Sequence, residues 1–212
     1  MSQAITIRDV EASDLPALKA MIDETWEWVD LVESQEALDA TIGLYLNQVL
    51  YGSSFGKVAL LDGKIVGAIF GAAEGEPPTY RMLQDDGMDH TLTLLNATEN
   101  ERRDVYECIS KINSTYADLL RGKADSYDGS LVFLAVSEAA QGLGLGKKLW
   151  QELRAYFEAN ATKSVYVYTD TDCNYQFYES VGFRRSGEQD LTCTFRVGDW
   201  DVRIFLYEYQ FD

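Results

Sequence analysis

The segment Gln141–Lys147 is the part of the sequence whose residue types and spacing could most readily do chemistry. It has glycines at positions 142, 144 and 146, after the apolar run Leu131–Val136 and before residues with the periodicity of an amphipathic helix. Backbone N–H groups at a helix start have no intrahelical partners, and the helix dipole adds partial positive charge there. Because glycine has no Cβ atom, such a turn forms a site suited to a phosphate or pyrophosphate.

Three phosphate-binding patterns can be compared with this segment. The Walker A pattern G-x-x-x-x-G-K-[ST] fails twice, because it needs glycine at Gln141 and serine or threonine at Lys148. The dinucleotide pattern G-x-G-x-x-G fails at Lys147, and the strand before it lies late in the chain rather than first. The pattern Q/R-x-x-G-x-G/A is matched in full by Gln141, Gly144 and Gly146.

This third pattern resembles the acetyl-CoA-binding motif of the GNAT superfamily of N-acetyltransferases. A second segment, Phe177-Tyr-Glu-Ser-Val-Gly-Phe183, is similar to the F-Y-x-x-x-G-F segment of that family. The N-terminal order of strand, helix, helix and hairpin also matches, so the resemblance covers nearly the whole chain except residues 75–128. The sequence departs from the family at Thr171, where an asparagine is frequent, and in the length of that stretch.

The resemblance implies acetyl-CoA as the cosubstrate. The edge of the strand 131–136 pairs with the pantetheine arm as an added strand would, in a V-shaped slot opened against the strand 164–169. The backbone residues implied in this pairing are Leu134, Ala135 and Val136, with the N–H groups of Leu134 and Val136 as the main partners. The pyrophosphate is expected at the Gln141 side chain and at the amides of Gly142, Leu143, Gly144, Leu145, Gly146 and Lys147. Asn174 is a further cofactor contact to test.

The resemblance also implies direct attack by a primary amine on the thioester, with Tyr178 as the acid that protonates the leaving thiolate. A phenol has a pKa of about 10 and a thiol about 8.5, so this proton transfer costs only about 2 kcal/mol. The alternative role for Tyr178 is packing beside Phe177 and Phe183. The expected base that takes the proton of the ammonium is Glu74. Asp128, Glu24 and an ordered water are the alternative bases.

Other chemically capable side chains carry weaker indications. Cys173 and Cys193 could form an acyl-enzyme, but neither has a histidine neighbour in sequence, and inert buried cysteine is commoner. Trp26 and Trp28 could provide an aromatic wall for a cationic amine, although packing between helix and sheet is the commoner use. His90 is expected to be a surface or packing residue.

The elements that must position these residues have local sequence signals. Near the N-terminus we expect a strand at Ala4–Arg8, a helix capped by Ser13 or Asp14, a second helix from about Ser34, and a hairpin over Lys57–Glu74 turning at Asp62-Gly63. Residues 75–128 should hold a short helix around His90–Leu95 and a longer one at Asn100–Leu120. Thr98 and Glu101 have capping-box spacing before the longer helix. Its expected apolar face is Val105, Ile109, Ile112, Tyr116 and Leu119.

The C-terminal part should alternate strands and helices around the glycine turn. We expect a buried strand at Leu131–Val136, a helix to about Asn160, a strand at Ser164–Thr169, a short helix at Asn174–Val181 ended by Gly182, and a hairpin of Leu191–Val197 and Asp201–Tyr209 turning at Gly198-Asp199. The fold class is therefore α/β (α+β), a GNAT-like mixed sheet of about seven strands with helices on both faces, splayed between the fourth and fifth strands. The expected organisation is a single domain, 1–212, with a helical insertion at about 75–128 that acts as a lid or as a homodimer surface.

Composition limits the classes of partner. The net charge of −17 disfavours nucleic acid and attracts cationic amines, or serves solubility alone. The three cysteines form no C-x-x-C pair, which favours a reducing, cytoplasmic location. One histidine excludes a multi-histidine zinc site, and no apolar run is long enough for a membrane span or a signal peptide. The leading function is acetyl transfer to an amine. A non-catalytic CoA-binding protein, or an interaction protein without a cofactor, is the alternative.

Overall fold

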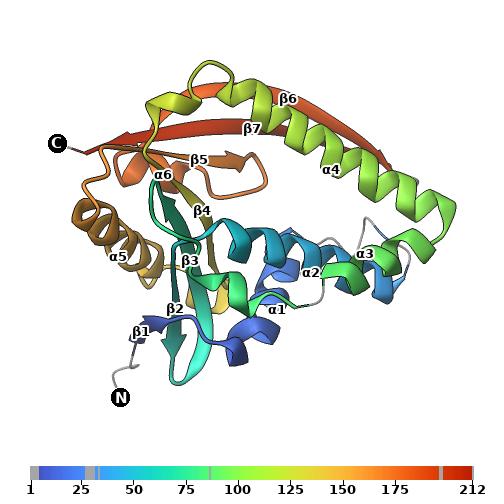
Figure 1. The fold of residues 1–212 in the computed structure, drawn as a ribbon, viewed down its shortest axis with the longest axis horizontal. Helices are drawn as coiled ribbons and strands as arrows, with labels where there is room; N and C mark the ends of the chain where they lie inside the picture. Colours follow the sequence, from blue (N-terminus) through green and yellow to red (C-terminus); the bar gives the residue numbers. More distant parts are fainter. Residues whose placement is uncertain (1–4, 27–31, 33, 86, 196–197, 212) are drawn as a thin grey trace.

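The protein forms a seven-stranded sheet in the strand order β1-β2-β3-β4-β5-β7-β6 (Figure 1). The computed structural model describes residues 5–26, 32, 34–85, 87–195 and 198–211. Only the pair β4–β5 is parallel among the described strands, and every other neighbouring pair is antiparallel. The strands are β1 Ile5–Asp9, β2 Phe55–Leu61, β3 Lys64–Ala73, β4 Gly129–Val136, β5 Ser164–Asp170, β6 Arg184–Phe195 and β7 Gly198–Gln210. The expected fold class is confirmed.

The described residues contain six α-helices, and those that pack on the sheet lie on both of its faces. The six helices are α1 Leu15–Trp26, α2 Gln35–Gly52, α3 Gly87–Asn96, α4 Glu99–Leu120, α5 Leu145–Ala159 and α6 Gln176–Ser180. Helix α5 packs on one face over a core that includes Leu149, Leu153 and Phe157. Helices α1 and α2 pack on the opposite face, over Val58, Phe70 and other residues of the central strands. The sheet therefore has one hydrophobic core on each of its two faces.

The N-terminal elements follow the expected signals with one correction. Asp62 and Gly63 both have positive φ, 50° and 82°, as a two-residue hairpin turn requires, and Ser34 caps α2 through its side chain. The first helical turn is instead preceded by Glu11, not capped by Ser13 or Asp14. The Asp14 carboxylate accepts the Glu11 N–H at 2.8 Å and pairs with Arg8. These two contacts hold Asp14 within the first helical turn, so it does not occupy the N-cap position.

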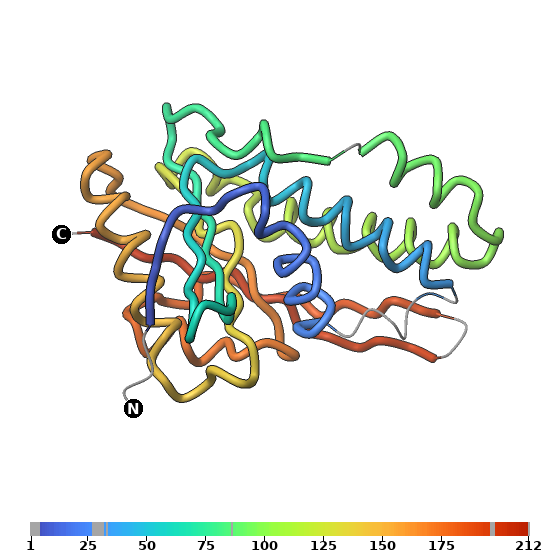
Figure 2. Tube along the Cα trace, turned by 90° about the horizontal axis from the view of Figure 1, so that it is seen from below, coloured from blue at the N-terminus to red at the C-terminus, as the bar shows by residue number. Residues whose placement is uncertain are grey.

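The stretch between β3 and β4 holds α3 and α4, as expected. Helix α2 lies between α1 and α3 (Figure 2), and a Cβ atom on Gly43 would come within 2.2 Å of His90 Nε2. His90 is therefore a packing residue that lies directly against α2. The capping box of Thr98 and Glu101 at the start of α4 is present as expected.

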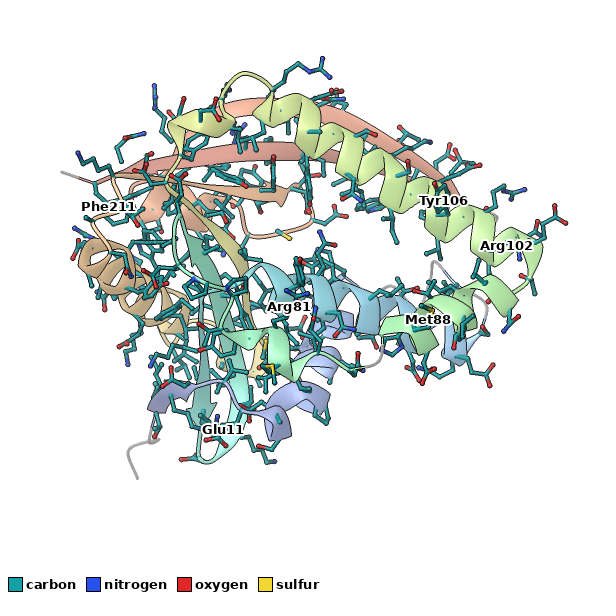
Figure 3. The ribbon with its side chains drawn as sticks, viewed as in Figure 1. Glu11, Arg81, Met88, Arg102, Tyr106 and Phe211 are labelled. Atoms are coloured by element: carbon teal, nitrogen blue, oxygen red, sulfur yellow. The ribbon has the colours of Figure 1, made fainter. Side chains whose placement is uncertain are left out.

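Helix α4 runs along the C-terminal hairpin of β6 and β7 (Figure 1). Its contact face includes the expected Val105, Ile112, Tyr116 and Leu119. It differs at one position, because Cys108 is buried against Cys193 and Ile204, whereas Ile109 is 40% exposed. At the end of the molecule where α3 and α4 meet, Met88 and Tyr106 have exposed side chains (Figure 3). Packing on the hairpin decides which face of α4 is inside.

The C-terminal hairpin is longer than expected. Strand β6 begins at Arg184, seven positions before the expected start at Leu191. Phe195 pairs with Gly198, which places Gly198 and Asp199 inside β7 and not in the turn. Residues 196–197, with Val197 of the expected strand, lie outside the described residues, as do Ala4 and Trp28. Pairing of β7 with both β5 and β6 extends the ladder beyond the local apolar pattern.

Candidate functional site

Strands β4 and β5 diverge after a short stretch of parallel pairing. They pair only at Gly129 with Val165 and Ser130 with Tyr166. Beyond that point β4 continues beside β3 to Val136, whereas β5 continues beside β7 to Asp170. The predicted splay between the fourth and fifth strands is confirmed, and we call the region between their separated carboxyl ends the slot.

The edge of β4 that faces this slot has backbone groups for an added strand. The Ser137 N–H donates to the Val66 carbonyl of β3 at 2.9 Å. Because N–H directions alternate along a strand, Ala135 also faces β3, and Leu134 and Val136 face the slot. The N–H groups of Leu134 and Val136 thus point where the sequence analysis expected an extended ligand, whereas that of Ala135 does not.

The turn after β4 has the geometry of an anion cradle. Gly142 and Gly144 have φ of 78° and 70°, a conformation that other L-residues rarely adopt. A Cβ atom at either glycine would meet no other atom within 4 Å, so the space above the turn is open. Gly144 is the N-cap of α5 and provides no side-chain cap for the first-turn amides. Exposed Gln141 and Lys147 flank the turn.

Three of the expected loop residues have different environments. Leu143 is 40% exposed at the tip of the turn, whereas Leu145 is 1% exposed and anchors α5 in the core. A Cβ atom on Gly146 would lie 3.1 Å from the ring of Phe177. Gly146 therefore allows α5 and α6 to pack closely. The sequence had suggested a different reason for this glycine, namely space for the pyrophosphate. This contact holds α6, and Tyr178 with it, beside the turn.

Tyr178 lies in the core and is 7% exposed. Its ring packs near Phe177, Phe183 and Tyr207, with centroid distances of 5.4, 5.6 and 5.9 Å. Burial raises the pKa of Tyr178, and the nearby Cys173 and Asp170 raise it further. The phenol is therefore neutral at physiological pH, as a proton donor must be.

The charges that act on Tyr178 come from the opposite face of the sheet. Val165 and Val167 of β5 belong to the core under α5, so Tyr168 and Asp170 face the other side. Tyr178 also belongs to the core under α5, yet it interacts electrostatically with Asp170. Where β4 and β5 diverge, no strand lies between the two faces of the sheet, so groups from opposite faces can interact.

Four side chains interact electrostatically with Tyr178, and we call them the slot cluster. Several of them also interact with one another. The four side chains are Tyr45 of α2, Tyr116 of α4, Asp170 of β5 and Cys173 of the following loop. Sequence analysis did not assign Tyr45, Tyr116 or Asp170 to the site. A polar residue at the end of the apolar strand 164–169 was the only local signal, and it is a weak one.

The expected bases Glu74 and Asp128 lie at the other end of β3 and β4. Ala73 pairs with Gly129 at the start of β4, and β4 rises about 3.3 Å per residue toward the glycine turn. The Asp128 carboxylate accepts the N–H groups of Lys163 and Ser164. Glu74 is exposed, and its N–H donates to the Asp128 carbonyl. The structure therefore does not bring either carboxylate to Tyr178.

The remaining candidates are placed as follows. The Glu24 carboxylate accepts the Glu138 N–H at 2.9 Å, which ties α1 to the loop after β4. Trp26 packs on Tyr45 and Phe133 at the slot cluster. Asn174 is exposed on the loop before α6.

The described residues also bear on the class of site. The described residues contain no group of three or more His, Cys, Asp or Glu side chains that could hold a metal ion. None of the described helices has the length and apolar character needed to cross a membrane.

Comparison with solved structures supports the fold. The chain is similar to an N-acetyltransferase from Staphylococcus aureus Mu50, with 14% identity, coverage of 98% of each chain and a TM-score of 0.53. It is also similar to yncA from Salmonella typhimurium, solved with its cofactor acetyl-CoA, with 15% identity, coverage of 99% and 95%, and a TM-score of 0.54. A ribosomal-protein-alanine N-acetyltransferase from Brucella melitensis has 16% identity, coverage of 97% and 99%, and a TM-score of 0.53. At these identities the likeness establishes the shared fold.

The sequence itself gives the family. No curated protein sequence matches the chain. Residues 16–183 match the model of the acetyltransferase (GNAT) family, which spans the slot, the glycine turn and Tyr178. This match agrees with the divergent strands and the glycine cradle, and with acetyl-CoA as the cosubstrate that the family uses. The chain therefore belongs to the GNAT family of acetyltransferases.

Proposed function

We propose that the protein transfers an acetyl group from acetyl-CoA to a primary amine by direct attack. The observation that supports this proposal is that three features lie next to one another around one opening. The uncapped turn at Gly142–Gly144 leads to the free edge of β4, and that edge leads to Tyr178. An anion cradle, an edge for an extended arm and a buried acid are the parts that such a transfer requires.

The residues at the opening fit acetyl-CoA, which supplies an acetyl thioester when bound. The first-turn amides of α5, with Gln141 and Lys147 beside them, would hold the pyrophosphate. The slot-facing amides of Leu134 and Val136 would hold the pantetheine arm. The open space above Gly142 and Gly144 supports this assignment, because Cβ atoms there would occupy it.

Tyr178 would give its proton to the departing thiolate. Because burial raises its pKa above the ordinary phenol value, this proton transfer costs more than the about 2 kcal/mol that reference values give. The transfer therefore needs the thiolate to form close to the hydroxyl group. The N–H proton that the amine nitrogen loses when the amide forms returns to the tyrosinate, so the residue ends the cycle neutral.

The acid role distinguishes this function from non-catalytic CoA binding. A panel of spermidine, an aminoglycoside, a free amino acid and a peptide with a free N-terminus should be assayed with acetyl-CoA for thiol release. Acetyl-CoA should also raise the melting temperature, since a ligand that binds only the folded state stabilises it. A thermal shift without thiol release from any amine would favour the non-catalytic alternative, and no thermal shift would contradict both.

Cytoplasmic location is part of the same proposal. Cys108, Cys173 and Cys193 are free thiols, which fits a reducing compartment.

A further inference from the structure

Asp170 is a buried carboxylate that forms no ion pair within the described residues. Three other buried acids have clear structural partners. Asp14 pairs with Arg8, Asp104 pairs with Arg103, and Glu101 accepts the Ser34 N–H. Asp170 is 7% exposed, and no lysine, arginine or histidine is among its partners in the described part of the chain. A buried carboxylate without a cation is costly even where N–H groups donate to it.

The backbone after β5 holds Asp170 in one orientation. Its Oδ1 atom accepts the N–H groups of Asp172 and Cys173, each at 3.0 Å. The Cys173 thiol is also hydrogen-bonded to the carboxyl group. Burial, together with Asp170, raises the pKa of that thiol to about 12, so it stays protonated. These three donors fix the carboxylate at the end of the strand, at the slot opening.

Tyrosine side chains from two separate helices interact electrostatically with this carboxylate. The ring of Tyr116 stacks on Tyr168 at a centroid distance of 4.0 Å, and the Tyr168 hydroxyl donates to the Tyr116 carbonyl. This double contact anchors α4 to β5 beside Asp170. Tyr45 approaches from α2, where its ring packs near Phe133 of β4. A carboxylate among tyrosine rings is a setting that recognises an alkylammonium, through charge and through cation–π attraction.

We propose that Asp170 binds the ammonium group of the acceptor amine and takes its first proton. This inference rests on the proposed function and identifies the base for the ammonium proton, which that function left unassigned. The acceptor R–NH₃⁺ gives one proton to the carboxylate, which leaves a neutral amine whose lone pair forms the new N–C bond as the C–S bond breaks. The carboxylic acid then releases that proton to solvent. The second nitrogen proton goes to Tyr178, as described above.

The same site favours one class of acceptor. Asp172 adds a second negative charge within two residues, and the whole chain has a net charge of −17. An α-amino acid would bring its own carboxylate next to Asp170, which like charges disfavour. We therefore infer an acceptor whose ammonium stands on an uncharged or cationic carbon chain, as in a polyamine.

The titratable groups around Asp170 are compatible with a base. They are Tyr45 from α2, Tyr116 from α4, Tyr178 from α6, and Asp172 and Cys173 from the adjoining loop. Burial raises the pKa of Asp170, and hydrogen bonds from Cys173 and from the backbone limit that rise. A carboxylate with a raised pKa is a stronger base, because its pKa lies closer to that of the ammonium group that gives up the proton.

The first test measures binding without activity. Spermidine should be titrated into the wild-type protein, Asp170→Asn and Asp125→Asn by calorimetry with CoA present. Asparagine keeps the shape and an acceptor oxygen for the two N–H groups. We expect at least tenfold weaker spermidine binding in Asp170→Asn and less than twofold change in Asp125→Asn, because Asp125 is an exposed carboxylate before the start of β4, away from the slot. Equal binding by all three proteins, or no binding by any, would overturn the proposal.

The second test separates this proposal from the proposed function. Asp170→Asn should keep the thermal shift given by acetyl-CoA, because Asp170 lies outside the glycine turn. Its kcat/KM for spermidine acetylation at pH 7 should fall about 100-fold and recover partly as the pH rises, since more amine is then already neutral. A loss of rate without this recovery would mean a structural role and would reject the base. Absence of an acetyl-CoA shift in the wild type would instead reject the proposed function.

Discussion

At the scale of single residues, the core packing of Tyr178 is compatible with the acid role that we propose for it. Its ring packs between Phe177, Phe183 and Tyr207, and it interacts electrostatically with groups across the slot. Packing in this case supports the acid role, because the aromatic core fixes the direction of the phenol and keeps it neutral. A substitution that keeps the ring and removes the oxygen should therefore separate catalysis from folding.

We predict that Tyr178→Phe lowers kcat at least 100-fold, while the affinity for CoA and the melting temperature stay close to those of the wild type. Thiol release and CoA titration give the two measurements. Tyr156→Phe is the matched control, since it removes a hydroxyl that bonds to Ser54 away from the slot. A Tyr178→Phe rate within twofold of the wild type would contradict the acid role.

The two kinds of glycine in the turn should respond differently to alanine. At Gly144 the added Cβ meets no neighbour, but φ is 70°, so Gly144→Ala should cost about 1 kcal/mol of stability and weaken CoA binding. At Gly146 the added Cβ would press on Phe177, so Gly146→Ala should displace α6 and lower kcat more than CoA affinity. Chemical unfolding and kinetics on both variants test this, and identical effects would refute the distinction.

At the scale of elements, helix α4 joins the stretch between β3 and β4 to the slot cluster. Helix α4 provides Tyr116 to the slot cluster and packs along the hairpin of β6 and β7. Its first turn is fixed to the start of α2 by Glu101, which accepts N–H groups of Ser34 and Thr98. Burial alone would raise the pKa of Glu101, but hydrogen bonds from Thr98 and Ser34 outweigh it and lower the pKa.

We predict that Glu101→Ala lowers the free energy of unfolding by about 2 kcal/mol, because it leaves buried N–H groups without an acceptor. Thr98→Ala removes one member of the same capping box and should cost about 1 kcal/mol. Urea unfolding measures both. Equal stabilities of the wild type and Glu101→Ala would show that the link between α4 and α2 contributes little.

At the scale of the whole molecule, a strongly acidic chain depends on a few cations to hold its helices together. Asp85 accepts hydrogen bonds from Lys19 of α1, Asn47 of α2 and His90 of α3, at 2.6, 2.7 and 3.0 Å. Burial opposes ionisation of Asp85, but these partners outweigh it and lower its pKa to about 2. One carboxylate thus connects three helices.

The folded-state pKa of Asp85 lies below its ordinary value, so its contribution to stability is present above about pH 4 and disappears as the pH falls toward 2. We predict that Asp85→Asn costs about 1 kcal/mol at pH 7, a figure discounted for the partial exposure of the side chain. Unfolding measured from pH 7 to pH 2 should show the two proteins converging at the acid end. A constant difference across that range would rule out this linkage.

The sequence by itself determined the features that depend on neighbouring residues. The glycine turn needs positive φ at Gly142 and Gly144, the hairpin needs it at Asp62-Gly63, and the capping box needs only the spacing of Thr98 and Glu101. These are local requirements of backbone geometry, so a short window of sequence contains them. The family motifs at the turn and around Tyr178 are of the same kind.

Only the tertiary structure decided which carboxylate meets Tyr178. Asp170 is the last residue of β5 and Glu74 directly follows the last residue of β3, and nothing within either segment distinguishes them. Strand β3 is antiparallel to β4, so Glu74 lies opposite the start of β4, whereas β5 is parallel to β4 and delivers Asp170 to the end where the strands diverge. The contact between Gly146 and Phe177, the buried face of α4 and the length of β6 also depend on pairing between distant segments, which no local periodicity encodes.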